Sequence, residues 1–401
     1  MSDKIANTGN KGSKSDCFIS LELTKSKGIQ IELKSKVDIL YGKSIKELVL
    51  KILQFFEINN AKVQIEDSGA LDFVIAARLE GAIKKLISTK KEYLLENVNE
   101  NKKPTDKDKK RFSRLYLPGN TPKFFINAGI YNSDGIILDL EDSVSIDKKQ
   151  EAQFLVRNAL RSVNFYDTER MVRINQIPKG LDDLNFVVSH NVNLILIPKV
   201  ESAEQIKTVD KEINKLKKDK DITYPIWFMP IIESALGVIN AYEIASASKN
   251  NVALAIGLED YTADIGTKRT QDANESFFAR TSIVNAAKAA RIQAIDSVFS
   301  DIEDMQGLKE TIKISKGLGF EGMGCIHPGQ IPVIHESYAP EKDDIEKAKK
   351  IVLAFDEAQK KGLAAVSLGS KMIDPPVVKR ALKIINIAIT TSLLKKNWKD
   401  E

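Results

Sequence analysis

Acidic and basic residues follow a series of short apolar segments in this chain of 401 residues. At residues 252–260 a run of Val, Ala, Leu, Ala and Ile ends at Gly257, and Glu259 and Asp260 come soon after it. An apolar run that stops abruptly is typical of a strand buried on both faces that leads into a functional loop. Carboxylates placed there can bind a divalent cation or transfer a proton. The pattern therefore predicts a site built from strand ends.

The same pattern recurs on both sides of this segment. The polar residues at or near the other predicted strand ends are Asn120, Asp139, Glu141, Asp142, Arg173, Lys199, Glu233, Asp301 and His327. Solvated loop charges would explain any single one of them. Eight strand ends that share one trend favour a common site instead.

Helical segments separate these strands. Apolar residues spaced for helical turns occur in 182–190, 203–217, 237–247, 275–290, 307–317 and 340–361. Strands that alternate with helices imply parallel pairing through right-handed crossovers. Eight such units in about 250 residues predict an α/β fold of the (β/α)8 TIM-barrel type, with its active site at the carboxyl ends of the strands.

Composition restricts the class of protein. The chain has 43% hydrophobic residues, a net charge of +5 and two cysteines. Cys17 and Cys325 lie far apart in the sequence, so we expect neither a disulfide framework nor a Cys-based zinc site. The first 16 residues are polar, and no apolar run approaches the roughly 18 residues that cross a membrane. We therefore expect a cytoplasmic protein that binds neither membranes nor nucleic acid.

Changes in composition divide the chain into four segments. Residues 1–88 alternate strands with amphipathic helices and predict a small α+β domain. Residues 89–110 are rich in Asn, Lys, Glu and Asp and predict a flexible charged linker. Residues 111–392 hold the predicted barrel, and residues 393–401 form a polar C-terminal tail. The small domain contains no His and no cluster that predicts an active site of its own.

The small domain resembles the acyl carrier protein, or gamma chain, of citrate lyase. The matching segments are Glu66–Asp72, Ala77–Glu80 and Gly9–Cys17. The resemblance implies that a serine in a G-x-x-x-S-x-D segment carries a prosthetic group of the phosphoribosyl-dephospho-CoA type through a phosphodiester. The spacing here differs from that pattern by about one residue. Counting forward from Gly9 gives Ser13, whereas counting back from Asp16 gives Lys14, which is next to Ser15. We favour Ser13 over Ser15, and two ordinary serines in a polar terminal segment are the alternative.

The barrel resembles the citrate lyase beta chain and the wider group of CoA-ester lyases, the HpcH/HpaI aldolases. The matching segments, in order, are 117–120, 139–142, 172–175, 198–202, 232–237, 257–260, 325–330 and 371–374. The resemblance implies a retro-Claisen cleavage of a β-hydroxy acyl thioester to a 2-oxo acid and an acyl thioester. The citrate-derived substrate would be a citryl thioester on the carrier or on free CoA. Citramalyl- and malyl-thioester lyases belong to the same group and remain alternatives.

The resemblance also implies roles for individual residues. Glu233 and Asp260 match the Mg²⁺ ligands of the group, and oxygen ligands are those that Mg²⁺ prefers. Arg173 matches an arginine that binds the substrate carboxylate, for which a guanidinium is suited because it donates two parallel hydrogen bonds. The alternatives are a helix N-terminal acid for Glu233 and, for Arg173, an ion pair with Glu141 or Asp142 inside the barrel.

The remaining predicted site residues have less specific roles. Asp139, Glu141 and Asp142 would position the metal-bound waters, hold Arg173 and position a catalytic base. The sequence does not show which of the three acids has which role. The thioester arm would contact Asn120, Arg111 and Lys199.

Asp374 matches an aspartate that serves as general acid in the active site of a neighbouring subunit. The alternative is that Asp374 initiates the last helix as an N-cap.

The resemblance implies partners as well. We expect a homo-oligomer, specifically a trimer, and a citrate lyase alpha-type transferase subunit that works on the same carrier. Two other readings stay open. The first is a lyase for free CoA esters with a vestigial carrier domain. The second is a non-catalytic scaffold that only presents the carrier arm.

Overall fold

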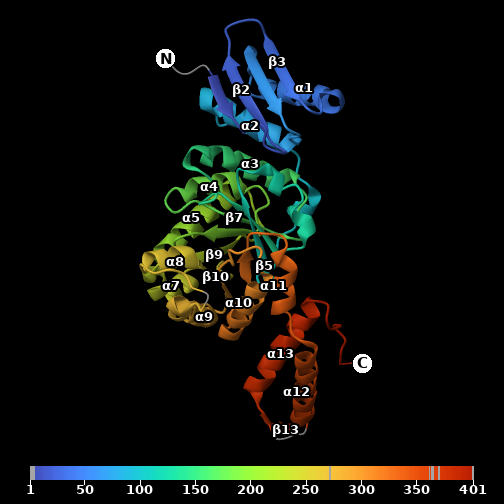
Figure 1. The fold of residues 1–401 in the computed structure, drawn as a ribbon, viewed down its shortest axis with the longest axis vertical. Coiled ribbons are helices and arrows are strands. Elements are labelled where there is room, and N and C mark those ends of the chain that lie inside the picture. The colour runs from blue at the N-terminus through green and yellow to red at the C-terminus, as the bar shows by residue number, and fades with distance from the viewer. Residues whose placement is uncertain (1–4, 271, 361, 363–364, 369–370, 400–401) are drawn as a thin grey trace. The chain divides into compact units, whose positions relative to one another are not determined.

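The computed structural model describes residues 5–270, 272–360, 362, 365–368 and 371–399 (Figure 1). The chain forms two compact units. The first comprises Met1–Ile302 with Leu318–Ile331, and the second comprises Glu303–Gly317 with Pro332–Glu401. The first unit contains both the small N-terminal domain and all the strands of the barrel.

The small N-terminal domain is a four-stranded sheet covered by two helices. Its strands pair in the order β1-β2-β4-β3, with β3 and β4 parallel and the other pairs antiparallel. Alternate residues of β2 and β4 are buried, as expected for a sheet with one covered face. The elements are β1 (Ile5–Thr8), β2 (Cys17–Leu23), β3 (Ile29–Ser35), α1 (Asp38–Phe55), β4 (Ala61–Asp67) and α2 (Asp72–Leu86). The predicted small α+β domain is confirmed.

The barrel is an eight-stranded sheet in which neighbouring strands are parallel. The strand order is β11-β10-β9-β8-β7-β6-β5-β12, and a parallel bridge between Asp296 and Met323 joins its two ends. The strands are β5 (Ser113–Pro118), β6 (Gly135–Asp139), β7 (Glu169–Arg173), β8 (Leu194–Ile197), β9 (Trp227–Ile232), β10 (Ala253–Ile256), β11 (Gln293–Ile295) and β12 (Met323–Cys325). The predicted (β/α)8 architecture is confirmed as a nearly closed barrel.

Helices cover the outside of the barrel. Strands β6, β8 and β10 are buried at every residue, because parallel strands are covered on both faces. The helices of the first unit that follow the strands are α3 (Lys149–Ser162), α4 (Gly180–Val187), α5 (Ala203–Asp219), α6 (Ala235–Ile239), α7 (Ala241–Ser246), α8 (Leu258–Asp264) and α9 (Phe277–Ala289). Each strand therefore ends at the same side of the sheet, where the loops to these helices begin.

Residues 89–110 follow the surface of the barrel for part of their length. Asn101 is buried, and its amide nitrogen donates to the carbonyls of Leu160 at 3.0 Å and Val163 at 2.6 Å. Thr105 donates to Glu169 at 2.7 Å. These hydrogen bonds fix the path of a segment for which composition predicts a flexible linker. The composition of this segment shows that it has few apolar residues, but it does not show which polar groups of the barrel will form hydrogen bonds with it.

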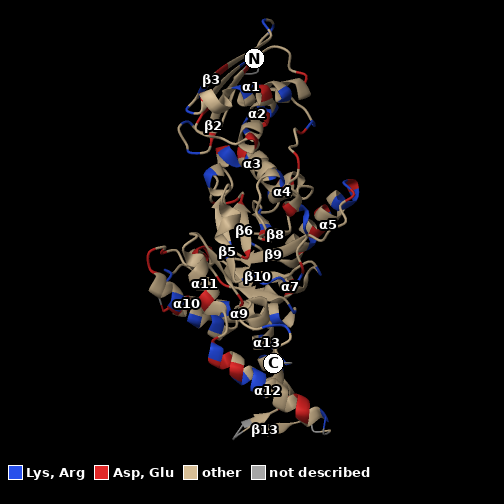
Figure 2. Ribbon diagram, turned by 90° about the vertical axis from the view of Figure 1, so that its right-hand side faces the viewer, with Lys and Arg blue, Asp and Glu red and all other residues tan. Residues whose placement is uncertain are grey.

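The second unit is helical with one short hairpin. Its core includes Ala348, Val352, Ala381, Ile385 and Trp398, so part of the predicted polar tail is buried here. Lys residues are interspersed with Asp and Glu along α12 (Figure 2). The elements that lie mostly or wholly in this unit are α10 (Met305–Leu318), α11 (Gln330–Tyr338), α12 (Lys342–Lys360), β13 (Val366–Leu368), β14 (Lys371–Ile373) and α13 (Pro375–Thr390). Among the described helices of the whole chain, none is long and apolar enough to cross a bilayer.

Candidate active site

A cavity of about 410 Å³ opens at the carboxyl ends of the barrel strands. Its lining includes Asp139 from the end of β6, Arg173 from the end of β7, Glu233 directly after β9, and Asp260 in the first turn of α8, which follows β10. Four of the residues that sequence predicts for the site therefore converge on one cavity, as the barrel architecture requires.

Arg173 and Asp139 form a bidentate ion pair at the base of this cavity. Nε of Arg173 donates to Oδ1 of Asp139 at 2.6 Å, and Nη2 donates to Oδ2 at 2.8 Å. The two residues are opposite each other in the β6–β7 register. Burial would raise the pKa of Asp139, but the hydrogen bonds and charge of Arg173 outweigh it and hold that pKa below its usual value. Arg173 is therefore positioned by Asp139 as a fixed cation.

The third nitrogen of Arg173 contacts a second acid. Nη1 lies 3.0 Å from Oε2 of Glu141 and 3.8 Å from Oδ2 of Asp142. The alternative of an ion pair inside the barrel is thus confirmed in the structure. Nη1 is the nitrogen outside the bidentate pair with Asp139, so an approaching carboxylate would meet Arg173 there. Binding of the substrate carboxylate by Arg173 stays a prediction.

Lys199 lies among the acids of the cavity. Its Nζ is 3.0 Å from Glu141, 3.3 Å from Asp142 and 3.8 Å from Asp260. Partial burial would lower the pKa of Lys199, but the neighbouring carboxylates, Glu141 foremost, raise it above its usual value. The ammonium of Lys199 is therefore held between three carboxylates, and its contact with the thioester arm stays a prediction.

Glu233 is an acid whose pKa is strongly raised by its surroundings. It is 6% exposed, and burial raises its pKa from the usual 4.5 to about 8. Its Oε2 accepts a hydrogen bond from the main-chain N–H of Lys199 at 2.9 Å. Gly257 leaves room for it, because a Cβ there would lie 2.5 Å from Oε1 of Glu233. A cation beside this carboxylate would restore its charged form.

The acids of the cavity suit one class of metal ion. Among the described residues, no group of three or more His, Cys, Asp and Glu side chains is arranged to hold a metal ion. Mg²⁺ needs fewer, because it keeps several waters and binds through one or two carboxylates plus substrate oxygens. Glu233 and Asp260 supply two carboxylates around one cavity, so the chemistry of the donor set fits Mg²⁺. The metal role of these two residues stays a prediction.

Arg111 lies elsewhere. It is fully buried, and its guanidinium forms two hydrogen bonds with Glu169, at 2.7 and 2.8 Å. Glu169 begins β7 and Arg111 precedes β5, so both lie at the amino ends of the strands. The expectation that Arg111 contacts the thioester arm is therefore corrected. A basic residue just before a strand cannot reach the opposite end of a barrel.

The other predicted residues occupy three places. Asn120 follows β5 at the cavity end, and its side-chain oxygen accepts a hydrogen bond from Thr121 at 3.0 Å. Ser13 and Ser15 lie, partly exposed, in the ordered β1–β2 loop of the small domain. Asp374 precedes α13 in the second unit and accepts a hydrogen bond from the N–H of Val377 at 3.2 Å. The N-cap alternative for Asp374 is confirmed, and its role as an acid in a neighbouring subunit stays a prediction.

Sequence analysis missed two side chains that line the cavity from β5. Tyr116 lies under Arg173, with 5.3 Å between the guanidinium carbon and the ring centroid, and burial raises the pKa of its phenol. Arg114 lines the cavity below it, and its Nη1 lies 2.9 Å from the sulfur of Met229. Residues two apart on a strand share a face, so the signal was the period of two in β5.

Comparison with known families agrees with this architecture. Residues 113–328 match the family model for HpcH/HpaI aldolase/citrate lyase. The chain belongs to this family. Residues 4–86 match the acyl-carrier-type model described as malonate decarboxylase delta subunit. Membership of the aldolase/citrate lyase family makes the chain a lyase, and both resemblances predicted from sequence are confirmed.

Named relatives include more than one substrate type. The citrate lyase subunit beta of Leuconostoc mesenteroides subsp. cremoris is 37% identical over 289 residues, which cover 71% of this chain and 95% of the relative. Human mitochondrial citramalyl-CoA lyase is 32% identical over 295 residues, covering 70% of this chain and 86% of the relative.

A solved structure shares the fold. CitE of Mycobacterium tuberculosis, in complex with magnesium, acetoacetate and coenzyme A, superposes with a TM-score of 0.58 at 29% identity. The match covers 70% of this chain and 98% of that one.

Proposed function

We propose that this member of the family is a Mg²⁺-dependent citryl-thioester lyase that releases oxaloacetate and leaves an acetyl thioester. One observation carries the proposal. A carrier-type domain shares the chain with the barrel, and its serine-containing loop contacts the barrel on the side where the strands end. A citrate lyase needs both parts, whereas a lyase for free CoA esters has no use for the carrier.

The cleavage develops negative charge first on the hydroxyl oxygen of the substrate and then on the enolate, and the cavity can stabilise both. The hydroxyl of the substrate must lose a proton so that its oxygen becomes the ketone of oxaloacetate. The electron pair of the broken C–C bond then passes to the α-carbon of the acetyl thioester, which forms an enolate with its carbonyl oxygen, and the α-carbon takes up a proton. When bound between Glu233 and Asp260, Mg²⁺ would lower the pKa of the hydroxyl and hold the 2-hydroxy carboxylate.

The chain's own residues divide the remaining tasks. Asp139 fixes Arg173 through two hydrogen bonds, and Nη1 of Arg173 would receive the substrate carboxylate in exchange for its contact with Glu141. Glu141 and Asp142, which share Lys199, are the acids left to accept the hydroxyl proton. Because both carboxylates contact Lys199, one of them can take up a proton while the ammonium of Lys199 still balances the charge of the other.

Three further parts complete the proposal. Ser13, or Ser15 in its place, carries a prosthetic group of the phosphoribosyl-dephospho-CoA type. Asp374 of a neighbouring subunit in a homotrimer protonates the enolate. An alpha-type transferase subunit reloads the carrier with citrate. The two serines fit this use because they are partly exposed in an ordered loop, where a transferase has access to the hydroxyl.

A panel of thioesters tests the substrate assignment. Purified protein with Mg²⁺ is given citryl-, citramalyl- and malyl-CoA, and the 2-oxo acid is identified by mass spectrometry. We expect oxaloacetate from citryl-CoA with the highest kcat/KM. A preference for citramalyl-CoA, with release of pyruvate, would favour the activity printed for the human relative and overturn the citryl assignment.

A further inference from the structure

The carrier domain packs against the barrel through its second helix. Every residue of α2 from Phe73 to Ile83 is buried, because one face of α2 covers its own sheet and the other meets α3 (Figure 1). Gly81 of α2 faces α3, since a Cβ there would lie in van der Waals contact with the ring of Phe154, at 3.5 Å. An isolated carrier would expose this second face.

Arg78 sits at one end of this helix pair and contacts three parts of the chain. Its Nε and Nη2 donate to the two carboxylate oxygens of Asp16, each at 2.9 Å. Its Nη1 lies 3.4 Å from Oε2 of Glu151 on α3, and Nη2 donates to the main-chain carbonyl of Asn120 at 3.3 Å. Arg78 is 1% exposed, Asp16 0% and Glu151 3%. A single buried guanidinium thus joins the carrier loop to one helix and one loop of the barrel.

Glu151 completes the contact from the barrel side. Its Oε2 accepts a hydrogen bond from the main-chain N–H of Gly9 at 2.8 Å, and Oε1 accepts one from Lys85 at 2.9 Å. Burial would raise the pKa of Glu151, but the Gly9 hydrogen bond and the charges of Lys85 and Lys148 lower it below its usual value. The carboxylate is therefore held ionised against the carrier.

The loop from Gly9 to Asp16 is also fixed within the carrier. The N–H of Ser15 donates to the carbonyl of Ser68 at 3.1 Å, and the N–H of Asp16 donates to the carbonyl of Ser13 at 3.2 Å. Gly9 has a φ of +77°, a conformation that glycine adopts without a steric penalty. Both candidate serines therefore lie in a loop whose shape and attachment to the barrel are set by buried groups.

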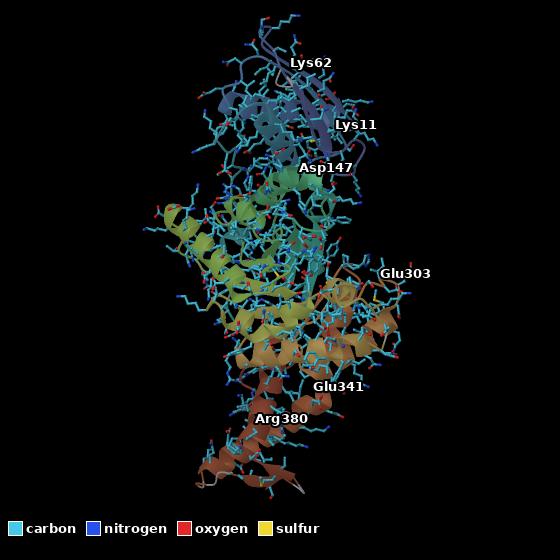
Figure 3. All side chains as sticks on the ribbon, turned by 90° about the vertical axis from the view of Figure 1, so that its left-hand side faces the viewer. Lys11, Lys62, Asp147, Glu303, Glu341 and Arg380 are labelled. Atoms are coloured by element: carbon cyan, nitrogen blue, oxygen red, sulfur yellow. The ribbon has the colours of Figure 1, made fainter. Side chains whose placement is uncertain are left out.

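The place of attachment is the rim of the catalytic end. Asn120 lies two residues after the end of β5, and Glu151 lies in the first turn of α3, which follows β6. Loops that follow strands surround the cavity end of the barrel. Figure 3 labels Lys11 in the carrier loop and Asp147 just before α3, at the junction of the two domains.

We propose that Arg78 and Glu151 form a latch that holds the arm-attachment loop at the rim of the barrel of the same chain. The carrier then delivers its thioester from a fixed docking position, and only the arm moves. Arg78 and Glu151 are positioning residues, since neither lines the cavity. The inference rests on the proposed function for the identity of the arm, but the docking itself does not depend on it.

Hydrogen–deuterium exchange of the full-length chain tests the docking. Glu151→Ala removes the acceptor of the Gly9 amide while the Arg78–Asp16 pair inside the carrier stays intact, so the domain keeps its fold. We expect exchange in a peptide covering the amide of Gly9 to become about ten-fold faster, because a hydrogen bond to a charged acceptor is lost. Arg78→Met should accelerate exchange across residues 9–16 as well. Equal exchange in wild type and Glu151→Ala would overturn the latch.

The control is an acid in the same position of another barrel helix. Glu204 lies in the first turn of α5 and its side chain is 77% exposed, so Glu204→Ala should leave exchange of the carrier loop unchanged. A loop that responds equally to Glu204→Ala would show a general loss of stability, which contradicts a specific latch.

Kinetics separate this inference from the proposed function. We expect Glu151→Ala to slow single-turnover cleavage of the carrier-bound thioester several-fold and to leave cleavage of free citryl-CoA unchanged. Equal loss on both substrates, or no loss on either, would overturn a delivery role. A wild-type protein that cleaves neither thioester would refute the proposed function, and the exchange experiment would still decide the docking.

Discussion

The buried pair of Arg157 on α3 and Glu80 on α2 gives the sharpest stability prediction. Nη2 of Arg157 lies 2.6 Å from Oε2 of Glu80 and Nη1 lies 3.1 Å from Oε1, and both side chains are 0% exposed. Arg157→Met leaves the carboxylate of Glu80 buried, with Lys84 at 3.3 Å as its remaining charged partner. Removing one partner of a buried pair costs about 3–5 kcal/mol. Lys84 should keep the loss near the lower limit, about 3 kcal/mol.

The double variant gives the opposite expectation. Replacing both residues by apolar side chains of similar volume is often neutral, because no charge is left buried. Arg157→Met with Glu80→Leu should therefore differ from wild type by no more than about 1 kcal/mol. The coupling between the two sites would then be several kcal/mol, which only directly interacting residues show.

Pulse proteolysis over a urea gradient provides the assay, with mass spectrometry of peptides from residues 1–88 to report on the carrier alone. A chain of several domains does not unfold in one step, so a signal averaged over the whole chain would mislead. The control is Lys62→Met, since the side chain of Lys62 is 36% exposed and pairs with the 57% exposed Glu32, which predicts a loss below about 1 kcal/mol. If Arg157→Met costs no more than this control, the reasoning about the interface is wrong.

Three other outcomes are expected. Glu233→Gln should lower turnover by roughly two orders of magnitude, because positioned charge stabilisation is lost; turnover within a few-fold of wild type would contradict the assignment. Intact mass of the native protein should show an arm-sized adduct that Ser13→Ala removes, and an adduct that survives both Ser13→Ala and Ser15→Ala would refute the mapping. Mixing Asp374→Asn chains with Glu233→Gln chains under subunit exchange should restore activity, because the two groups serve one site from different subunits. If activity does not recover although mass spectrometry confirms the exchange, Asp374 acts on the site of its own chain or is only a helix cap.

The sequence predicted the cavity because strand ends of a parallel barrel meet on one side. Asp139, Arg173, Glu233 and Asp260 could therefore be assigned to one site before any geometry was known, and all four line the cavity. The period of two that places Tyr116 in the cavity was also present in the sequence.

Pairing among charges could not be predicted in the same way. Lys199 follows a strand, as a ligand-binding residue would, but its direction depends on which neighbouring strands end in acids. Arg111 precedes a strand, and only the registers of β5 with β6 and of β6 with β7 bring Glu169 close enough to neutralise it. The docking of the carrier depends on contacts between residues more than 60 positions apart, such as Arg78 with Glu151, for which composition contains no signal.

The metal dependence of citryl-thioester cleavage tests the central claim most directly. Wild-type protein is freed of metal with a chelator, given citryl-CoA, and assayed for oxaloacetate before and after Mg²⁺ is restored. The account predicts no cleavage without the ion and full recovery with it, because Glu233 and Asp260 supply only part of the coordination and charge that the reaction needs. Undiminished oxaloacetate release from fully chelated protein would contradict it.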